Sequence, residues 1–245
     1  MKSKEKIVML TAYDYPMARL MDNIVDIILV GDSLGMVVLG HENTLKVTMQ
    51  DMIRATEAVS RGAKTPLIVG DMPIGTYDNN EDALKNAKLF LRAGANVVKI
   101  ERKPEIAEFI IKNGIDVMGH IGLTPQTITN FKVQGKNEDD AERLLEEAKQ
   151  MEKSGCFSLV LECIPISLAK KITEAISIPT IGIGAGQFCD GQVLVSHDLL
   201  GLFDKFKPRF VKRYAEIGEQ IKKAFLEYKK DVKEGKFPTE KFGFR

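Results

Sequence analysis

Four apolar segments of the sequence each end in an acidic residue: Asp32, Asp71, Glu101 and Glu162. A fifth apolar segment ends in His120. An ionised carboxylate at the end of a buried strand is costly unless a metal or a bound partner compensates its charge. Five such residues at equivalent places predict a site on the carboxyl-terminal rim of a parallel sheet, where α/β proteins carry their chemistry.

Three of these acids suit a metal site. Asp32, Asp71 and Glu101 follow the second, third and fourth predicted strands. Neighbouring strands lie about 4.8 Å apart, so oxygen ligands from adjacent strand ends can converge on one ion. Oxygen ligation without a thiolate favours a hard cation, most often Mg²⁺. The alternative is that each acid caps the helix that follows its strand.

Lys99 and Glu162 have possible roles beside that metal. Lys99 lies two residues before Glu101, so both side chains project from one face of their strand. Lys99 could neutralise the acids or hold an anionic substrate, or form a structural pair with Glu101. Glu162 belongs to a later strand. A carboxylate outside a metal's field in a partly desolvated site suits a general base, although a pair with a loop cation also explains it.

Two further features permit more than one interpretation. His120 could orient a substrate, shuttle protons or serve as a structural group. The segment Gly182–Gly186 follows a predicted strand and is rich in glycine. It lacks the Walker lysine and the full GxGxxG spacing, so it indicates close backbone approach at the rim rather than nucleotide binding.

The elements that must position these residues are short apolar runs alternating with amphipathic stretches. The predicted strands are Ile7–Ala12, Asp26–Val30, Leu67–Gly70, Asn96–Ile100, Asp116–Gly119, Ser158–Leu161, Thr180–Gly184 and Val193–Val195. The predicted helices are Val47–Arg61, Asn80–Ala93, Asp139–Lys153, Ile166–Ile176 and Phe210–Tyr228.

This alternation predicts the α/β class and a closed (β/α)8 TIM barrel, formed as a single domain over residues 1–245. Thr48 and Asn79 are expected helix N-caps, and Gly94 and Gly155 are expected helix stops. The longest irregular stretch, from Gly122 to Asn137, is a candidate flap over the site.

Composition narrows the class of partner. The net charge of +1 gives no reason to expect nucleic acid or an anionic membrane. Three cysteines without CxxC spacing suit a reducing compartment. No apolar run approaches the roughly 18 residues of a membrane span, and no signal-peptide core follows the first residues. We therefore expect a cytoplasmic protein.

At these same positions the chain resembles the ketopantoate hydroxymethyltransferase family. The resemblance spans Met9 to Gly201. The matching segments are MLTAYDYPMA, VGDSLGMVVLGHENTLKVT, GDMPIGTY, RAGANVVKIE, MGHIGLTPQ, KVQGK, LVLECIP and IPTIGIGAGQFCDGQVLVSHDLLG.

The resemblance implies a barrel of the phosphoenolpyruvate/isocitrate lyase type. It also implies transfer of a one-carbon unit from 5,10-methylenetetrahydrofolate to 3-methyl-2-oxobutanoate, which yields ketopantoate for pantothenate and coenzyme A synthesis. Family members form large homo-oligomers, so a homodecamer is expected.

Residue roles follow from the same resemblance. Asp32 and Asp71 would hold Mg²⁺ beside the substrate, with Glu101 bound to the ion directly or through water. The keto acid would be bound by Ser33 and Lys99. Glu162 would be the proton acceptor, and His120 would line the pocket.

The sequence departs from the family pattern in two places. Only about six residues precede the first strand, and the stretch 127–135 is short and lacks a Gly-Gly pair. Closure of the barrel base and the flap's handling of folate are therefore expected to differ.

Two alternative functions are also considered. One is a Mg²⁺-dependent 2-oxo acid lyase or aldolase, which would usually carry a Lys-Lys-Cys-Gly-His pattern. The other is a non-catalytic metabolite-binding barrel.

Overall fold

The computed structural model describes residues 5–126 and 132–244. The chain forms two compact units, residues 1–195 and residues 196–245. The single domain over residues 1–245 stays a prediction.

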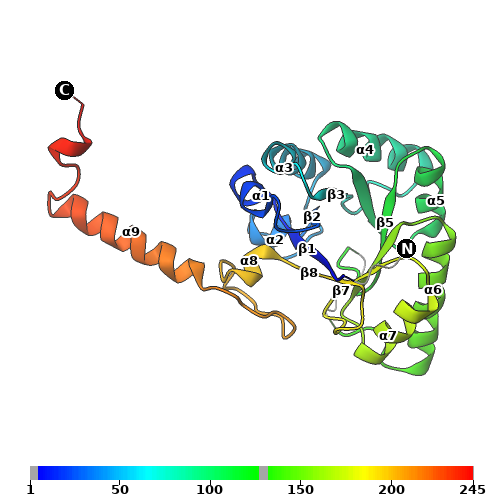
Figure 1. Cartoon of the computed structure of the whole chain (residues 1–245). Helices are drawn as coiled ribbons and strands as arrows, with labels where there is room; N and C mark the ends of the chain where they lie inside the picture. Colours follow the sequence, from blue (N-terminus) through cyan, green and yellow to red (C-terminus); the bar gives the residue numbers. More distant parts are fainter. Residues whose placement is uncertain (1–4, 127–131, 245) are drawn as a thin grey trace. The chain divides into compact units, whose positions relative to one another are not determined.

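The first unit is a closed barrel of eight parallel strands in sequence order (Figure 1). The strands are β1 (Ile7–Thr11), β2 (Ile27–Val30), β3 (Leu67–Asp71), β4 (Val97–Glu101), β5 (Val117–Gly122), β6 (Ser158–Glu162), β7 (Thr180–Ile183) and β8 (Gly191–Leu194). β8 pairs with β1, which closes the ring. The predicted (β/α)8 barrel is confirmed, and all eight strands lie where the apolar runs predicted them.

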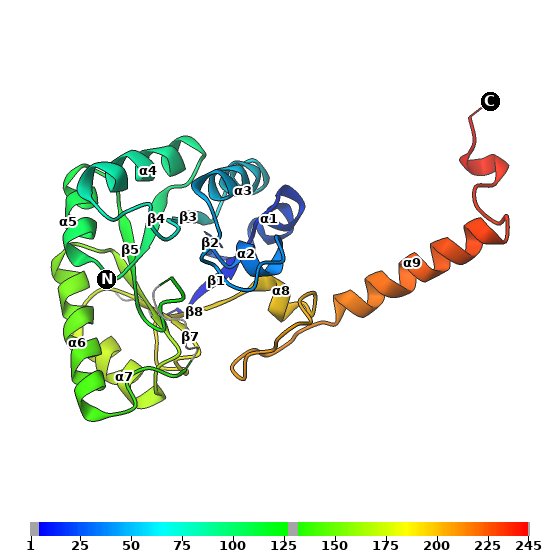
Figure 2. The same ribbon diagram turned by 180° about the vertical axis from the view of Figure 1, so that it is seen from behind.

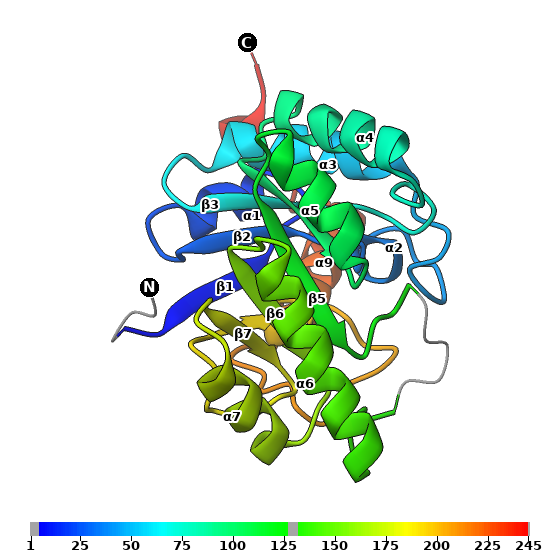
Figure 3. The ribbon, with the colours of Figure 1, turned by 90° about the vertical axis from the view of Figure 1, so that its right-hand side faces the viewer.

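Helices surround this barrel (Figures 1 and 2). They are α1 (Tyr15–Met21), α2 (Leu34–Val37), α3 (Met49–Gly62), α4 (Asn80–Arg92), α5 (Pro104–Lys112), α6 (Glu138–Lys153) and α7 (Ile166–Ala175). In Figure 3, α4, α5 and α6 follow one another along the outside of the strands. Among the described residues, β7 and β8 are joined without a helix.

Local signals account for the boundaries of the long helices. The side chain of Thr48 accepts from the backbone of Asp51 in a capping box, and Asn79 caps α4 in the same way. Gly94 and Gly155 adopt φ angles of +100° and +94° just after α4 and α6. The predicted caps and stops are confirmed.

The amphipathic pattern did not predict α1, α2 or α5. α1 and α2 span only seven and four residues, too few to show a periodic apolar stripe. α5 has nine residues, of which Ile106, Ala107 and Ile110 are buried. It begins at Pro104, a residue that favours the first helical position because it lacks a backbone N–H.

Side chains along each strand point alternately into the barrel and outward to the helices, which gives two apolar clusters. The barrel interior is filled by one cluster that includes Val69, Val97, Met118 and Val160. Residues of the other parity, such as Val98, pack outward against the helices in a second cluster. Because side chains alternate, the residue two positions after each interior residue also faces inward, one layer nearer the carboxyl-terminal rim. Those next positions hold Asp71, Lys99, His120 and Glu162.

The second unit contains α8 (Ser196–Leu199), α9 (Ile217–Lys233) and a short 3₁₀ helix at Glu240–Phe242. The helix expected at Phe210–Tyr228 therefore begins later and extends further than the pattern predicted. The backbone N–H groups of Tyr214 and Ile217 donate to the carbonyls of Leu199 and Leu200. These long-range bonds hold the segment before α9 outside the helix.

Two sequence expectations concern segments outside the barrel strands. The candidate flap from Gly122 to Asn137 includes residues 127–131, which lie outside the described residues, as does most of the short stretch 127–135. Over residues 5–126 and 132–244, no helix has both the length and the apolarity needed to cross a membrane.

Candidate active site

The strand ends bring the predicted acids to one rim. Register pairs Asp71 with Lys99, Glu101 with His120, and Gly122 with Glu162 on neighbouring strands. Asp71 is only 1% exposed, whereas the side chain of Glu162 is 17% exposed. The site therefore has a deeply buried acidic side and one acid that reaches its open edge.

Asp71 and Lys99 form a buried ion pair. Lys99 Nζ lies 2.6 Å from Asp71 Oδ1, and the backbone N–H of Asp32 donates to the other oxygen of Asp71. Lys99 thus pairs with Asp71, where the sequence had offered Glu101 as its structural partner. The N-caps of α2, α4 and α5 are Ser33, Asn79 and Lys103. Helix capping therefore does not explain the acids at the ends of β2, β3 and β4.

His120 lies between two carboxylates. Its Nδ1 is 3.3 Å from Glu101 Oε1, and its Nε2 is 3.2 Å from Glu162 Oε2. Neither nitrogen makes a well-aligned hydrogen bond with a described group. The sequence left open a pair between Glu162 and a cation in a loop. In the structure the partner of Glu162 is instead the imidazole of His120.

Ser33 lies next to Asp32, at the start of α2. Its Oγ is 2.8 Å from the hydroxyl of Tyr13, which comes from the segment after β1. Two hydroxyls from neighbouring strand ends therefore adjoin the acids. The predicted substrate contact by Ser33 stays a prediction.

Gln126 is a central residue that the sequence reasoning did not single out. Its side chain is 2% exposed. Its Nε2 donates to Asp32 Oδ2 and to the carbonyl of Met72, both at 3.0 Å. The backbone N–H of Gln126 donates to Glu101 Oε2 at 3.2 Å. The segment MGHIGLTPQ contained this residue, but a lone glutamine in a loop carries no spacing signal.

Burial and like charge govern the electrostatics of the rim. Burial, together with the nearby carboxylate of Asp71, raises the pKa of Asp32 to about 8. Burial also raises the pKa of Asp71, although Lys99 opposes the shift. For Lys99 burial lowers the pKa, but Asp71, Glu101 and Asp32 outweigh it and hold the pKa above its usual value. The ammonium form of Lys99 is therefore stable.

The donor set fits a hard divalent cation. The carboxyl groups of Asp32, Asp71 and Glu101 are buried together at the rim, with Lys99 paired to Asp71. Mg²⁺ takes one or two protein carboxylates and keeps waters for the remaining positions. In the described parts of the chain, no group of three His, Cys, Asp or Glu side chains is arranged to hold a metal ion by itself. The assignment of Asp32, Asp71 and Glu101 as Mg²⁺ ligands stays a prediction.

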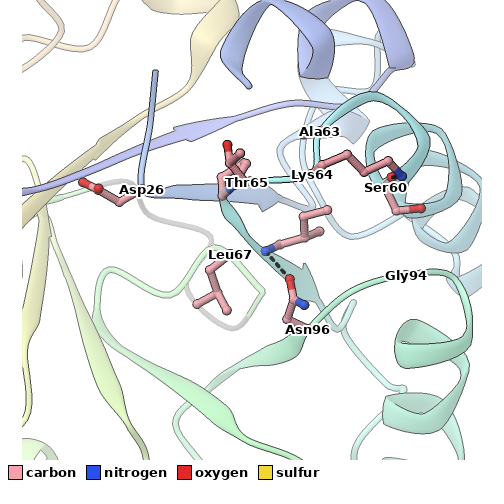
Figure 4. A pocket seen from close by; sticks show the side chains of 10 residues that line it. Asp26, Ser60, Ala63, Lys64, Thr65, Leu67, Gly94 and Asn96 are labelled. Atoms are coloured by element: carbon pink, nitrogen blue, oxygen red, sulfur yellow. Dashed lines mark hydrogen bonds between the residues drawn. The ribbon is translucent and has the colours of Figure 1, made fainter. Parts of the chain in front are cut away.

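A groove at the opposite ends of the strands is not part of this site. It has a volume of about 660 Å³ and lies at the amino ends of β2, β3 and β4 (Figure 4). Its Asp26 and Asn96 accept from the backbone N–H groups of Val8 and Ile68, so they secure strand ends. In (β/α)8 enzymes the active site lies at the carboxyl-terminal face, which is opposite this groove.

The fold and the rim together define an enzyme barrel with its site at the carboxyl ends of the strands. The phosphoenolpyruvate phosphomutase of Streptomyces platensis subsp. rosaceus superposes with a TM-score of 0.65 at 13% identity, covering 95% of this chain and 85% of that one. A 2,3-dimethylmalate lyase of the PEP mutase/isocitrate lyase superfamily superposes with a TM-score of 0.61 at 12% identity, covering 98% and 87%. Solved proteins of the expected barrel type therefore share the fold of this chain.

Sequence comparison names the family within that class. The ketopantoate hydroxymethyltransferase family model matches residues 1–240, and the chain belongs to this family. The 3-methyl-2-oxobutanoate hydroxymethyltransferase of Clostridium botulinum (strain 657) is 57% identical, covering 98% of this chain and 91% of the relative. The enzyme of that name from Thermotoga maritima is 55% identical, covering 100% and 93%. The chain is thus a transferase of pantothenate biosynthesis that carries out hydroxymethyl transfer.

Proposed function

We propose that this enzyme transfers the one-carbon unit of 5,10-methylenetetrahydrofolate to 3-methyl-2-oxobutanoate, with Mg²⁺ and Glu162 promoting enolisation. The products are ketopantoate and tetrahydrofolate. One water is consumed, because the methylene carbon leaves both folate nitrogens and gains a hydroxyl. The observation that carries the proposal is the rim itself: three buried carboxyl groups, one of them paired with Lys99, and a fourth carboxylate at the open edge.

The buried side of the rim would hold the cation and the head of the keto acid. Asp32 and Asp71 are proposed as cation ligands, with Glu101 beside them. Bound Mg²⁺ would supply Lewis-acid polarisation of the 2-oxo group, which acidifies the neighbouring C3–H. The ammonium of Lys99 would offset the charge of the substrate carboxylate, and Ser33 would donate a hydrogen bond to it.

Glu162 is proposed as the general base. It would take the proton from C3, leaving an electron pair that forms the new carbon–carbon bond to the methylene carbon. Its partial exposure leaves it within reach of a substrate, and a carboxylate that does not ligate a cation is a stronger base than one that does. His120 contacts Glu162 and would line the pocket beside the reacting carbon.

One assay tests the reaction. Purified protein is incubated with 3-methyl-2-oxobutanoate, 5,10-methylenetetrahydrofolate and Mg²⁺, and ketopantoate is quantified by mass spectrometry. We expect ketopantoate and tetrahydrofolate in equal amounts, with none when Mg²⁺ is chelated. A folded protein that makes no ketopantoate contradicts the proposal. Cleavage of a 2-oxo acid without folate would favour the lyase alternative.

We further propose that the chain self-associates, as a homodecamer, and acts in the cytoplasm. Ile221, Phe225, Tyr228 and Val232 are spaced four, three and four residues apart, so they share one face of α9. Each is at least 38% exposed within one chain. Such an apolar stripe suits a second copy of the chain. Three unpaired cysteines suit a reducing compartment.

Sedimentation velocity tests the assembly. We expect one large species for the wild type and smaller species for Phe225→Asp. The matched control is Lys229→Asp on the same helix. A wild-type protein that sediments as a monomer contradicts self-association.

A further inference from the structure

We propose that Gln126 is a positioning residue that sets the carboxylates of Asp32 and Glu101 for cation binding. This role rests on the cation site proposed above. Gln126 contacts one acid with its side chain and the other with its backbone. A single loop residue thus spans acids that come from β2 and β4.

Every hydrogen-bonding group of the Gln126 side chain has a partner. The two N–H groups of the amide donate to Asp32 and to the carbonyl of Met72. The amide oxygen accepts from the hydroxyl of Tyr77 at 2.5 Å. An amide with all its bonds made in a buried place has one orientation, so the carboxylate of Asp32 is held in one orientation too.

Charge explains why an amide suits this position. Lysine or arginine could also donate to Asp32 and Glu101, but either would add a positive charge and weaken the field that attracts a cation. An amide donates hydrogen bonds and leaves the negative charge in place. Gln126 therefore stabilises the acids in position while keeping the site attractive to a divalent ion.

Tyr77 supports this arrangement from the other side. Its hydroxyl donates to the amide oxygen of Gln126 and accepts from the backbone N–H of Glu101 at 3.3 Å. The amide oxygen is thereby held on Tyr77, and an N–H group of the amide faces the carboxylate of Asp32. Tyr77 acts on the cation site through Gln126, so their substitutions are expected to be coupled.

Mn²⁺ binding, followed by electron paramagnetic resonance of the free ion, measures this role without turnover. Gln126→Met keeps the volume of the side chain and removes its polar groups. We expect its Mn²⁺ dissociation constant to rise by about 10- to 100-fold, as when hydrogen-bond partners of metal ligands are removed. Tyr77→Phe should cause a smaller rise, and the double variant should resemble Gln126→Met because the effects are not additive.

Gln150→Ala is the control, since Gln150 lies exposed on α6, and it should bind Mn²⁺ as the wild type does. Wild-type protein that binds no Mn²⁺ overturns the cation site itself. If the wild type binds and Gln126→Met binds equally well, the cation site stands and the role of Gln126 is overturned. If Gln126→Met fails to fold, Tyr77→Phe decides: unchanged Mn²⁺ affinity overturns the role, and weakened affinity supports it.

Discussion

The Nε2 atom of His120 lies 3.2 Å from Oε2 of Glu162, and the opposite ring nitrogen faces Glu101. Burial lowers the pKa of His120, but the two carboxylates outweigh burial and raise the pKa to about 9. At neutral pH the imidazole is therefore charged and holds both carboxylates. The proposed base is thus electrostatically connected, through His120, to Glu101 on the buried side of the rim.

Glu162→Gln should separate binding from proton removal. The amide keeps the shape of the side chain but cannot accept the C3 proton. We expect the keto acid to bind with similar affinity, while solvent deuterium no longer enters C3 and turnover falls by about 10²- to 10⁴-fold. Proton NMR follows the exchange. Glu174→Gln on α7 is the control, and persistent exchange in Glu162→Gln would remove Glu162 from this role.

Lys99→Met should destabilise the metal-free protein. The substitution leaves Asp71 buried without its cation, and breaking a buried pair in this way costs about 3–5 kcal/mol. Urea unfolding measures the loss, and Mg²⁺ should restore part of it by supplying positive charge. Lys112→Met, at an exposed ion pair with Glu108, should change the free energy of unfolding by less than about 1 kcal/mol. Equal losses in the two variants would contradict the prediction.

Mg²⁺ affinity should rise with pH up to about 8. The pKa of Asp32 is raised from 3.8 to about 8, so below pH 8 a cation must displace a proton from the folded protein. The dissociation constant should fall by up to about 10-fold per pH unit and then level off. Calorimetry in buffers of different ionisation enthalpy would detect the released proton. Affinity that is independent of pH from 6 to 8 would contradict this assignment.

The same raised pKa predicts how the stability of the metal-free protein depends on pH. Between pH 3.8 and about 8, the folded state binds more protons at Asp32 than the unfolded state does. The contribution of Asp32 to the free energy of unfolding therefore decreases as pH rises through this window, by at most about 1.4 kcal/mol per unit. Asp32→Asn should remove this slope in urea titrations at several pH values. An identical slope in the variant would assign it to other groups.

Gly122→Ala should displace Glu162. Gly122 has a φ of +98°, and an added Cβ would lie 2.2 Å from the backbone oxygen of Glu162. We expect a loss of roughly 3 kcal/mol in urea unfolding, together with slower C3 exchange. Gly114→Ala is a matched control, because Gly114 has a φ of +83° but no atom within 4 Å of the added Cβ. It should lose only about 1–2 kcal/mol and keep normal exchange.

Much of the barrel was predictable because its signals are local. A strand buried on both faces is apolar along its length, so the eight strands stood out as short runs bounded by turn residues. The acids at the ends of β2, β3, β4 and β6 followed directly, since parallel strands bring their carboxyl ends to one rim. Helices α1 and α2 were missed because seven and four residues are too few to show a period of 3.6.

Side-chain partners were less predictable. Period-2 spacing correctly placed Lys99 and Glu101 on one face of β4, but Lys99 pairs with Asp71 of the neighbouring strand. The start of α9 also depends on remote partners, because the backbone N–H groups of Tyr214 and Ile217 donate to the carbonyls of Leu199 and Leu200. Such pairings join residues that are distant in the sequence, and no periodic pattern records them.

The order of residue types was therefore enough to predict a (β/α)8 barrel, its acidic rim and, by family resemblance, its reaction. The folded chain added the contacts that organise the rim: His120 between Glu101 and Glu162, and Gln126 between Asp32 and Glu101. The physical reason is that burial, orientation and charge coupling depend on which groups meet in space. Strand register and loop conformation determine which groups meet, and both bring together residues that are far apart in the sequence.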